Sequence, residues 1–388
     1  MKHYFLFILL SAAIATGGCT EELQPQTCGT NGTVPDESEL TEAVLNLSVN
    51  AFVVEAQAET RASIPSGTPE KETPEEKEIH NIWVFQYDAA TKELLIKPRY
   101  YTITDQAMLQ DLPVYLKAGV PSVVYVVTNT GYDNWANDGT DASWQKFKQL
   151  EQLKKQTLPT AFPLRSIDKV SIPMAGASEE VEVTTGITVT VPVTRMYAKL
   201  KVKVEMRKAE MELNNVNVRQ IPNICRVETL AGDGKGEPME PVPFPDETTF
   251  SSIAFAASDL EKNEDKEWAV FYVPENLQGE TQTQGGNKSD AAPSNALVVD
   301  ITTEIGGERY LYAAYPGGNS LNNFNIQRNQ VYRITVTITG EKNQNNPSAN
   351  CFVVKPDGFL SFEPYYRVET GGGYNFADYL SPHDENLK

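Results

Sequence analysis

The stretch that most constrains the fold of this chain is residues 43–62, AVLNLSVNAFVVEAQAETRA. Leu45, Leu47 and Val49 alternate with polar residues, and an apolar run that includes Phe52 follows. Alternation with a period of two is typical of a strand that buries one face. We therefore predict a long first strand here, whose four apolar side chains pack against the rest of the protein.

This strand ends in an arginine, next to a segment with little tendency to fold. Arg61 and Ala62 close the stretch, and residues 63–77 are rich in Pro, Glu, Lys, Thr and Ser, a composition typical of flexible segments. A trypsin-like protease that cut after Arg61 could release the strand and leave an unpaired edge and an open apolar groove. The alternative is an ordinary first strand followed by an arginine with no special role.

The chain begins with the pattern of an export signal. A short basic start precedes an apolar run at residues 4–15, which is too short to span a bilayer, and small residues then lead to Cys19. The pattern predicts a lipoprotein signal peptide at residues 1–18, cleavage before Cys19 and a lipid on its thiol. Residues 19–42 are polar and are expected to form a lipidated tether. The alternative is an ordinary secretory signal with an incidental cysteine.

Composition excludes several classes of function. The formal net charge of −19 at pH 7 argues against nucleic acids and anionic lipid surfaces as partners. The three histidines and four scattered cysteines show no metal-ligand spacing, and no nucleophile motif is present. We therefore predict that the protein is not an enzyme, with no catalytic residues, no metal and no cofactor. Cys225 and Cys351 could pair, or each could be a free buried thiol.

Most of the remaining sequence has the pattern of short strands. Residues 79–88, IHNIWVFQYD, are apolar on both faces and predict a central strand. Residues 141–155 instead carry Trp144, Phe147 and further apolar side chains at helical spacing, which predicts one short amphipathic helix laid against a sheet. The predicted fold class is all-β.

The strand count predicts two β-sandwich domains, residues 43–194 and residues 195–388. The last strand of the first domain contains Pro192, which is expected to place it at a sheet edge or a bulge. The second domain begins with residues 195–206, RMYAKLKVKVEM, whose alternating lysines predict a solvated face that protects a sheet edge. These lysines are Lys199, Lys201 and Lys203.

Several motifs resemble the Bacteroidales type V pilins, the fimbrillin family of FimA-like and Mfa-like proteins. The resemblance covers nearly the full length, and it is most specific in VFYVPENLQG at residues 270–279 and NNFNIQRNQVYRITVTITG at residues 322–340. The other motifs are Cys19, the strand ending at Arg61 and Ala62, IHNIWVFQYD, LKAGVPSVVYVVTNTG, VTRMYAKLKVKVE and ANCFVVKPDGFLSFEP.

This resemblance implies two transthyretin-like β-sandwich domains and a subunit that reaches the outer membrane as a lipoprotein before it joins a cell-surface fimbrium. An arginine-specific protease is expected to cut between Arg61 and Ala62 and release the strand that carries Leu45, Leu47 and Phe52. A C-terminal strand of a neighbouring subunit is then expected to fill the groove. The implied partners are other fimbrial subunits through donor-strand insertion, the protease, and the outer membrane through the lipid anchor.

Two other roles remain open at this point. One is a tip or adhesin subunit of the same fimbria, which accepts a strand without donating one. The other is an uncleaved surface lipoprotein that binds glycan or protein. The tail has glycines at residues 371–373 and a short apolar stretch at residues 374–380, a pattern that does not separate a stalk subunit from a tip subunit.

Overall fold

The fold of the described part of the chain is all-β, as the sequence predicts, because strands dominate its regular structure and helices are few and short. The predicted functional positions Cys19, Arg61 and Ala62 lie outside the described residues, as do Cys351 and the glycines at 371–373. The computed structural model describes residues 40–52, 72–131, 133, 135–136, 141–159, 164–165, 171–206, 209–228, 240–260, 267–281, 292–318, 322–338, 352–354 and 362–368.

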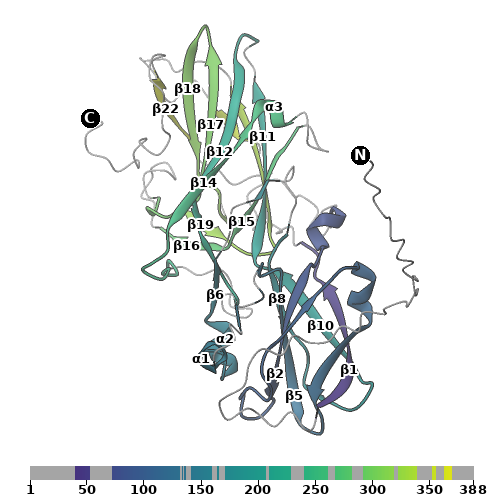
Figure 1. Ribbon diagram of the computed structural model, residues 1–388. Helices are drawn as coiled ribbons and strands as arrows, with labels where there is room; N and C mark the ends of the chain where they lie inside the picture. The colour runs from purple at the N-terminus through teal and green to yellow at the C-terminus, as the bar shows by residue number, and fades with distance from the viewer. Residues whose placement is uncertain are drawn as a thin grey trace, which may run out of the picture.

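The N-terminal half of the molecule is built on one eight-stranded sheet (Figure 1). The strand order is β3-β2-β5-β8-β10-β1-β4, and β9 pairs with β5 off this path. The strands are β1 (Leu40–Val49), β2 (Asn81–Asp88), β3 (Arg99–Thr102), β4 (Leu112–Lys117), β5 (Pro121–Thr128), β8 (Met174–Ala177), β9 (Val181–Glu182) and β10 (Thr188–Arg195).

Strand β10 connects two parts of this sheet that enclose one apolar core. Residues 188–193 of β10 pair with β1, whereas residues 194–195 pair with β8. The buried side chains between the two parts include Leu45 of β1 and Val191 of β10 on one side, and Val84 of β2 and Val126 of β5 on the other. The predicted central strand is confirmed, because β2 lies between β3 and β5 and its interior residues are all buried.

The C-terminal half contains two five-stranded sheets around a second core, to which Leu200, Val218, Phe271 and Val299 contribute. Their orders are β21-β20-β11-β15-β7 and β14-β12-β17-β18-β22. The strands are β7 (Leu164–Arg165), β11 (Tyr197–Met206), β12 (Glu212–Pro222), β14 (Phe250–Ala256), β15 (Ala269–Pro274), β17 (Val298–Ile305), β18 (Glu308–Ala314), β20 (Val331–Ile338), β21 (Phe352–Val354) and β22 (Phe362–Val368).

A third core joins the two halves. It contains Phe85 of β2 and Tyr125 of β5 together with Cys225 and Tyr272 from the C-terminal half. Two strands from the middle of the sequence cross to the C-terminal half, because β6 (Thr157–Pro159) pairs with β13 (Ile224–Arg226) and β7 pairs with β15. A further small sheet pairs β16 (Asn276–Glu280) with β19 (Asn323–Ile326).

The single helix predicted at residues 141–155 is wrong, because the structure has two short helices there, α1 (Asp141–Gln145) and α2 (Leu150–Lys154). The break between them arises because the backbone turns to pair with the segment before β3. The Leu94 amide donates to the Lys148 carbonyl at 2.9 Å, and Glu93 forms a bridge with Gln149. The predicted apolar stripe is nevertheless core: Trp144, Phe147, Leu150 and Leu153 are all buried.

The described residues contain three further short helices, which are the 3-10 helices η2 (Pro74–Lys77) and η3 (Gln106–Gln110) and the α-helix α3 (Ala257–Leu260). Helix η2 lies in the segment 63–77 that the sequence predicts to be flexible. That prediction is wrong for the described part of the segment, because the side chain of Glu76 in η2 is fully buried. In the described part of the chain, the structure has no helix of the length and apolarity that a membrane crossing requires.

The sheet edge predicted from Pro192 is also wrong. Strand β10 is interior, with β1 on one side and β8 on the other. Pro192 fits there because it stands opposite Ser48 of β1, just before the pairing with β8 starts at Thr194. Proline has no amide hydrogen, and this is tolerated at a strand position whose amide would not take part in the hydrogen bonds of the sheet. The two backbones approach closely at this point, and a Cβ atom on Gly176 of β8 would lie 1.8 Å from the Pro192 carbonyl oxygen.

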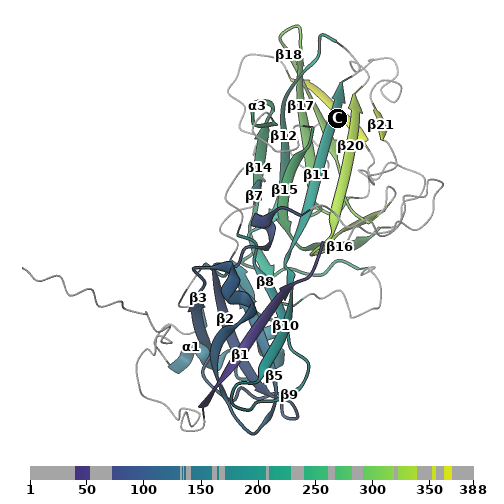
Figure 2. The same cartoon turned by 90° about the vertical axis from the view of Figure 1, so that its right-hand side faces the viewer.

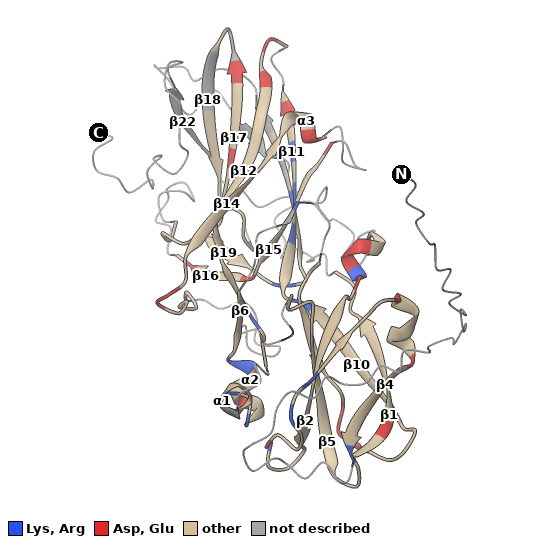
Figure 3. Cartoon of the chain, viewed as in Figure 1, with Lys and Arg blue, Asp and Glu red and all other residues tan. Residues whose placement is uncertain are grey.

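The prediction that the lysine row of β11 protects a sheet edge is wrong. Strand β11 lies between β15 and β20 in the middle of its sheet. Lys199 is buried, whereas Lys201 and Lys203 are only partly exposed. Figure 3 shows the basic residues of this strand in blue. The difference at Lys199 has a physical cause, because its ammonium group pairs with the buried carboxylate of Glu76 at 2.7 Å.

Candidate functional site

The predicted first strand exists and lies inside its sheet. Strand β1 pairs parallel to β10, with Val44 opposite Thr188 and Val49 opposite Val193, and antiparallel to β4, with Leu40 opposite Lys117. It begins at Leu40, three residues before the stretch singled out in the sequence. Figure 2 shows β1 in purple, running beside β10 toward the C-terminal half. Strand β1 lies between β10 and β4, so its removal would leave each of them without a strand partner on that side.

The apolar side chains of β1 face the core of the N-terminal half. Ala43 and Leu45 are fully buried and Leu47 is 3 % exposed, while Val49 is partly buried against the same core. They share this core with Val191 of β10, Val114 of β4 and Val84 of β2. The predicted apolar face is therefore correct for the residues of β1 itself.

Phe52 belongs to a different environment. Strand β1 ends at Val49, and residues 50–52 continue without regular structure toward the junction of the two halves. The Asn50 amide still donates to the Val193 carbonyl at 2.9 Å. Phe52 is 3 % exposed and packs in the third core, which joins the halves. The strand predicted within residues 43–62 therefore ends earlier than expected, at Val49, and Phe52 packs at the junction of the two halves.

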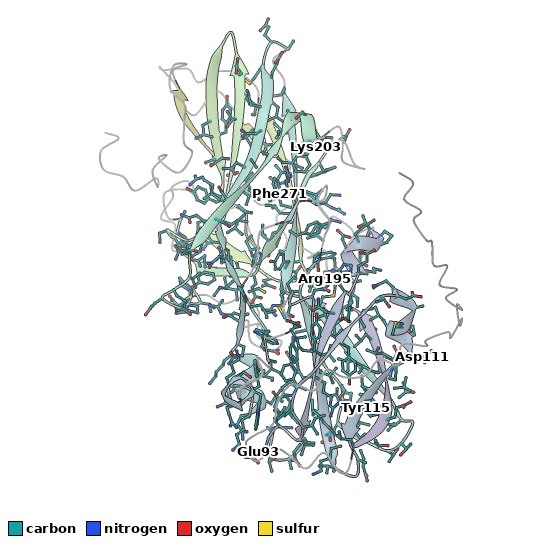
Figure 4. The ribbon with its side chains drawn as sticks, in the orientation of Figure 1. Glu93, Asp111, Tyr115, Arg195, Lys203 and Phe271 are labelled. Atoms are coloured by element: carbon teal, nitrogen blue, oxygen red, sulfur yellow. The ribbon has the colours of Figure 1, made fainter. Side chains whose placement is uncertain are left out.

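A group of buried polar side chains surrounds residues 50–52. We call it the Arg195 cluster, and Figure 4 shows the labelled Arg195 between the two halves. It contains Glu72, Glu76, Arg195, Lys199, Tyr272 and Asn329. These residues come from η2 and the segment before it, the end of β10, strands β11 and β15, and the turn before β20. Several segments distant in sequence therefore meet at this point.

The cluster binds the main chain of residues 50–52 directly. Arg195 Nη1 donates to the Asn50 carbonyl at 2.7 Å, and Asn329 Nδ2 donates to the Ala51 carbonyl at 2.7 Å. The Phe52 amide donates to Glu72 Oε1 at 2.8 Å. Backbone groups that leave water need such partners, because an unpaired buried group costs about 1–3 kcal/mol. These three hydrogen bonds supply them.

The Phe52 ring lies against positive charge. The guanidinium carbon of Arg195 is 4.1 Å from the ring centroid, and Lys199 Nζ is 5.7 Å from it. A cation over an aromatic face contributes about 0.5–2 kcal/mol, with the larger values in desolvated sites. The side chain of Arg195 is 0 % exposed, so this contact belongs to the desolvated class.

The charges inside the cluster compensate one another. Arg195 donates to the Glu76 carbonyl at 2.8 Å, and its Nη2 lies 3.1 Å from Glu72 Oε1. Burial lowers the pKa of the Arg195 guanidinium, and the carboxylates of Glu72 and Glu76 oppose that shift. Burial also raises the pKa of Tyr272, whose hydroxyl donates to Glu76 at 2.6 Å. Paired in this way, buried ionic groups are tolerated, whereas loss of one partner is costly.

Glu72 is the acid of the cluster whose titration is perturbed downward. Burial alone would raise the pKa of its carboxyl group. Hydrogen bonds from Lys77 and from the Phe52 amide, together with the charge of Arg195, nevertheless hold the pKa below its ordinary value of 4.5. The carboxylate is therefore ionised at neutral pH, the form that accepts the Phe52 hydrogen bond.

The structure places the other sequence-based candidates as follows. Cys225 is a free, buried thiol, and burial raises its pKa to about 12, so the thiol is protonated near neutral pH. The lipidation position Cys19 and the cleavage position Arg61 and Ala62 stay predictions. Among the residues that the structure describes, no group of three or more His, Cys, Asp and Glu side chains is arranged to hold a metal ion.

Comparisons with known proteins give one family and several solved structures. Residues 271–336 match a family described as a domain of unknown function (DUF4906). No curated protein matches the chain. Among solved structures, the tip fimbrial protein Mfa3 from Porphyromonas gingivalis, with C-terminal truncation, is 14 % identical with a TM-score of 0.47, over 84 % of this chain and 100 % of that one.

Two further solved structures have similar scores. A fimbrial assembly protein from Parabacteroides distasonis is 14 % identical with a TM-score of 0.45, over 84 % of this chain and 98 % of that one. The fimbrial anchor protein Mfa2 from Porphyromonas gingivalis is 11 % identical with a TM-score of 0.38, over 84 % of this chain and 100 % of that one. All three are fimbrial proteins, the class that the motifs of this chain resemble, and at these identities none of them assigns a function to it.

Proposed function

We propose that this protein is a structural subunit of a fimbrium that assembles by strand exchange. In this proposal an arginine-specific protease cuts between Arg61 and Ala62, strand β1 leaves, and a strand from a neighbouring subunit takes its place. The observation that carries the proposal is the position of β1. It is an interior strand and the first of the described strands, and the main chain joins it to the rest of the fold through residues 53–71, which contain Arg61.

Release of β1 would expose a surface suited to another strand. Strand β10 would lose its partner along residues 188–193, and β4 would lose its partner along residues 112–117. The core positions filled by Ala43, Leu45 and Leu47 would be open at the same time. An incoming strand restores the backbone hydrogen bonds and fills the apolar slot together, which is the recognition mode known as β-augmentation.

The expected energetics favour a durable contact. Each recovered backbone hydrogen bond contributes about 1 kcal/mol net, and each buried leucine-sized side chain contributes about 1.5–3 kcal/mol. Summed over a strand of this length, these terms make dissociation slow. A groove on one subunit filled by a strand of the next is a head-to-tail contact that does not close on itself, so repetition of the contact builds a filament.

The route to the cell surface belongs to the same proposal. The signal at residues 1–18 would direct export, and lipid on Cys19 would hold the precursor at the outer membrane before it enters the fimbrium. Domain boundaries at 43–194 and 195–388, with a transthyretin-like sandwich in each, are proposed with it. The two separate apolar cores of the N-terminal and C-terminal halves support that division. No catalytic step by this chain is required.

One observation favours a second candidate, an uncleaved surface lipoprotein that binds glycan or protein and keeps β1. The Arg195 cluster holds residues 50–52 through three hydrogen bonds and a ring contact. A strand fixed in this way could remain a permanent part of the fold. A tip or adhesin subunit of the fimbria would accept a strand at the same groove.

The test is to mix purified subunits after cutting with an arginine-specific protease and to look for ladders on denaturing gels without boiling. Cut wild-type protein should form ladders of regular spacing. The matched control is Arg61→Lys, which keeps the positive charge but is not a site for the protease, and it should remain monomeric under the same treatment. Cut wild-type protein that stays monomeric, with β1 still bound, would favour the surface lipoprotein over the fimbrial subunit.

A further inference from the structure

The groove that holds β1 continues beyond the end of the sheet. Residues 50–52 extend beyond β1, and the residues that bind them lie after the predicted cleavage site in sequence: Glu72 and Arg195, with Asn329 in the C-terminal half. A cut after Arg61 and the departure of β1 would therefore leave this binding apparatus in place on the subunit.

The Arg195 cluster binds residues 50–52 mainly through their main chain. Two carbonyl oxygens, those of Asn50 and Ala51, and the amide of Phe52 form the three hydrogen bonds. Any residue other than proline offers the same groups, so these bonds select an extended chain in the right direction and not a particular sequence. Asn50 and Ala51 are exposed, and Asn50 adds one side-chain hydrogen bond, in which its Nδ2 donates to Thr194 Oγ1 at 2.8 Å.

Phe52 is the residue of this segment whose side chain is buried. Its ring is buried in the third core and lies over the guanidinium of Arg195, 4.1 Å from ring centroid to guanidinium carbon. It follows Leu47, the last buried residue of β1, by five positions, and the partly buried Val49 by three. An occupant with an aliphatic or polar residue there would leave the space beside Arg195 partly empty and the cation without its ring.

An empty cluster would be unfavourable. Arg195 is 0 % exposed, and departure of residues 50–52 would remove a carbonyl acceptor and the aromatic ring from it. Asn329 would lose the Ala51 carbonyl at the same time. Buried donors that lose their acceptors cost more than the net value of the hydrogen bonds. An occupant that replaces both acceptors and the ring is therefore strongly favoured over one that fills the groove alone.

We propose that the Arg195 cluster is the terminal subsite of the strand-binding groove and selects a subunit strand that carries an aromatic residue five positions after its last buried aliphatic residue. This inference rests on the proposed function. The occupant runs in the direction of β1, because that direction points its carbonyls at Arg195 and Asn329. The apolar groove binds the strand, and the subsite fixes its register, since a slip of two residues would remove the aromatic ring from the cation.

The experiment uses the full chain cut at Arg61 and fluorescent synthetic peptides as probes. The peptides are residues 40–52, residues 40–49, residues 40–52 with Phe52→Ala, and residues 40–52 with Ser48→Ala as the control at an exposed position. Anisotropy measures how well each displaces the native fragment. Residues 40–52 should bind at least tenfold more tightly than residues 40–49 or the Phe52→Ala peptide, and the Ser48→Ala peptide should match residues 40–52 within about twofold, where tenfold corresponds to about 1.4 kcal/mol.

A pair of protein variants tests the subsite by changing the groove and not the peptide. Asn329 and Asn129 both have a left-handed backbone, with φ of 56° and 54°, and both bond to carbonyls through the side chain, but only Asn329 contacts residues 50–52. Glycine tolerates this backbone. Asn329→Gly should bring the affinities of the two peptide lengths together, whereas Asn129→Gly should leave their ratio unchanged. If Asn329→Gly does not fold, the peptide comparison on the wild-type chain still decides.

The outcomes separate the two proposals. Equal binding of residues 40–52 and 40–49 would overturn the subsite and leave strand exchange intact. Failure of every peptide to enter the cut protein would overturn strand exchange and the subsite with it. Tenfold discrimination that depends on Phe52 and disappears in Asn329→Gly supports the subsite.

Discussion

Truncation of one side chain in β1 tests whether this strand is both a stabilising and a removable element. Leu47 is 3 % exposed and packs in the N-terminal core. Leucine-to-alanine changes in such sites cost about 2–5 kcal/mol, because the transfer free energy of the side chain is lost and a cavity remains. For Leu47→Ala a loss of about 3 kcal/mol lowers the midpoint of thermal unfolding by about 6–12 °C in a unit of 150–250 residues.

The assay is thermal unfolding of the intact chain, followed by the same measurement after the cut at Arg61 and removal of the released fragment. The control is Ser48→Ala, the next residue along β1, whose side chain is exposed and which should change the stability by less than about 0.5 kcal/mol. After release, wild-type and Leu47→Ala proteins are chemically identical and should unfold at the same temperature.

Two results would refute the reasoning at different points. If Leu47→Ala destabilises the intact chain no more than Ser48→Ala does, the apolar face of β1 is not a source of stability. If the two cut proteins still differ, the fragment that contains residue 47 remains bound after cleavage. Release of β1 as the route to strand exchange would then be excluded.

Three further predictions concern the lipid, the protease and pH. Cys19→Ala should abolish fatty-acid labelling and remove the protein from outer-membrane fractions; normal labelling of the variant would show that the lipid is elsewhere. Limited digestion with an arginine-specific protease should cut first at Arg61, because residues 62–71 directly after it are rich in Pro, Ser and Gly and favour an accessible chain. N-terminal sequencing would detect a different first cut. Because the folded-state pKa of Glu72 is depressed, its contribution to stability is present above about pH 4.5 and is lost as pH falls through the depressed value. Glu72→Gln should therefore make the free energy of unfolding less dependent on pH in the acid range, and an unchanged acid profile would contradict this role.

Local patterns in the sequence predict where the strands lie along the chain, but they do not predict which strands are adjacent in a sheet. Alternation identifies β1 and its buried residues Leu45 and Leu47, and the two-faced apolar run identifies β2 as central. Periodicity reports which face of a strand is buried, but not which strands lie beside it. For this reason the sequence did not predict that β10 is interior despite Pro192, or that β11 lies in the middle of its sheet.

The junction shows where sequence reasoning missed functional residues. Val189, Val191 and Val193 place one face of β10 in the core, and the same period of two continues to Arg195. A buried arginine requires carboxylate or carbonyl partners, so this continuation was an available signal. The partners themselves could not be read from the sequence, because Glu72 precedes Arg195 by a long interval and Asn329 follows it by 134 residues.

The hydrogen bond between Asn329 and the Ala51 carbonyl joins residues 278 positions apart, and this separation bears on the order of folding. Closing so long a loop has a large entropic cost, and folds dominated by distant pairs form slowly. The β1 segment leaves the ribosome among the first, yet its parallel partner β10 and its contact at Asn329 are made much later. The contact at Asn329 therefore closes late in folding, and until it closes the groove of β1 is open to any other extended strand.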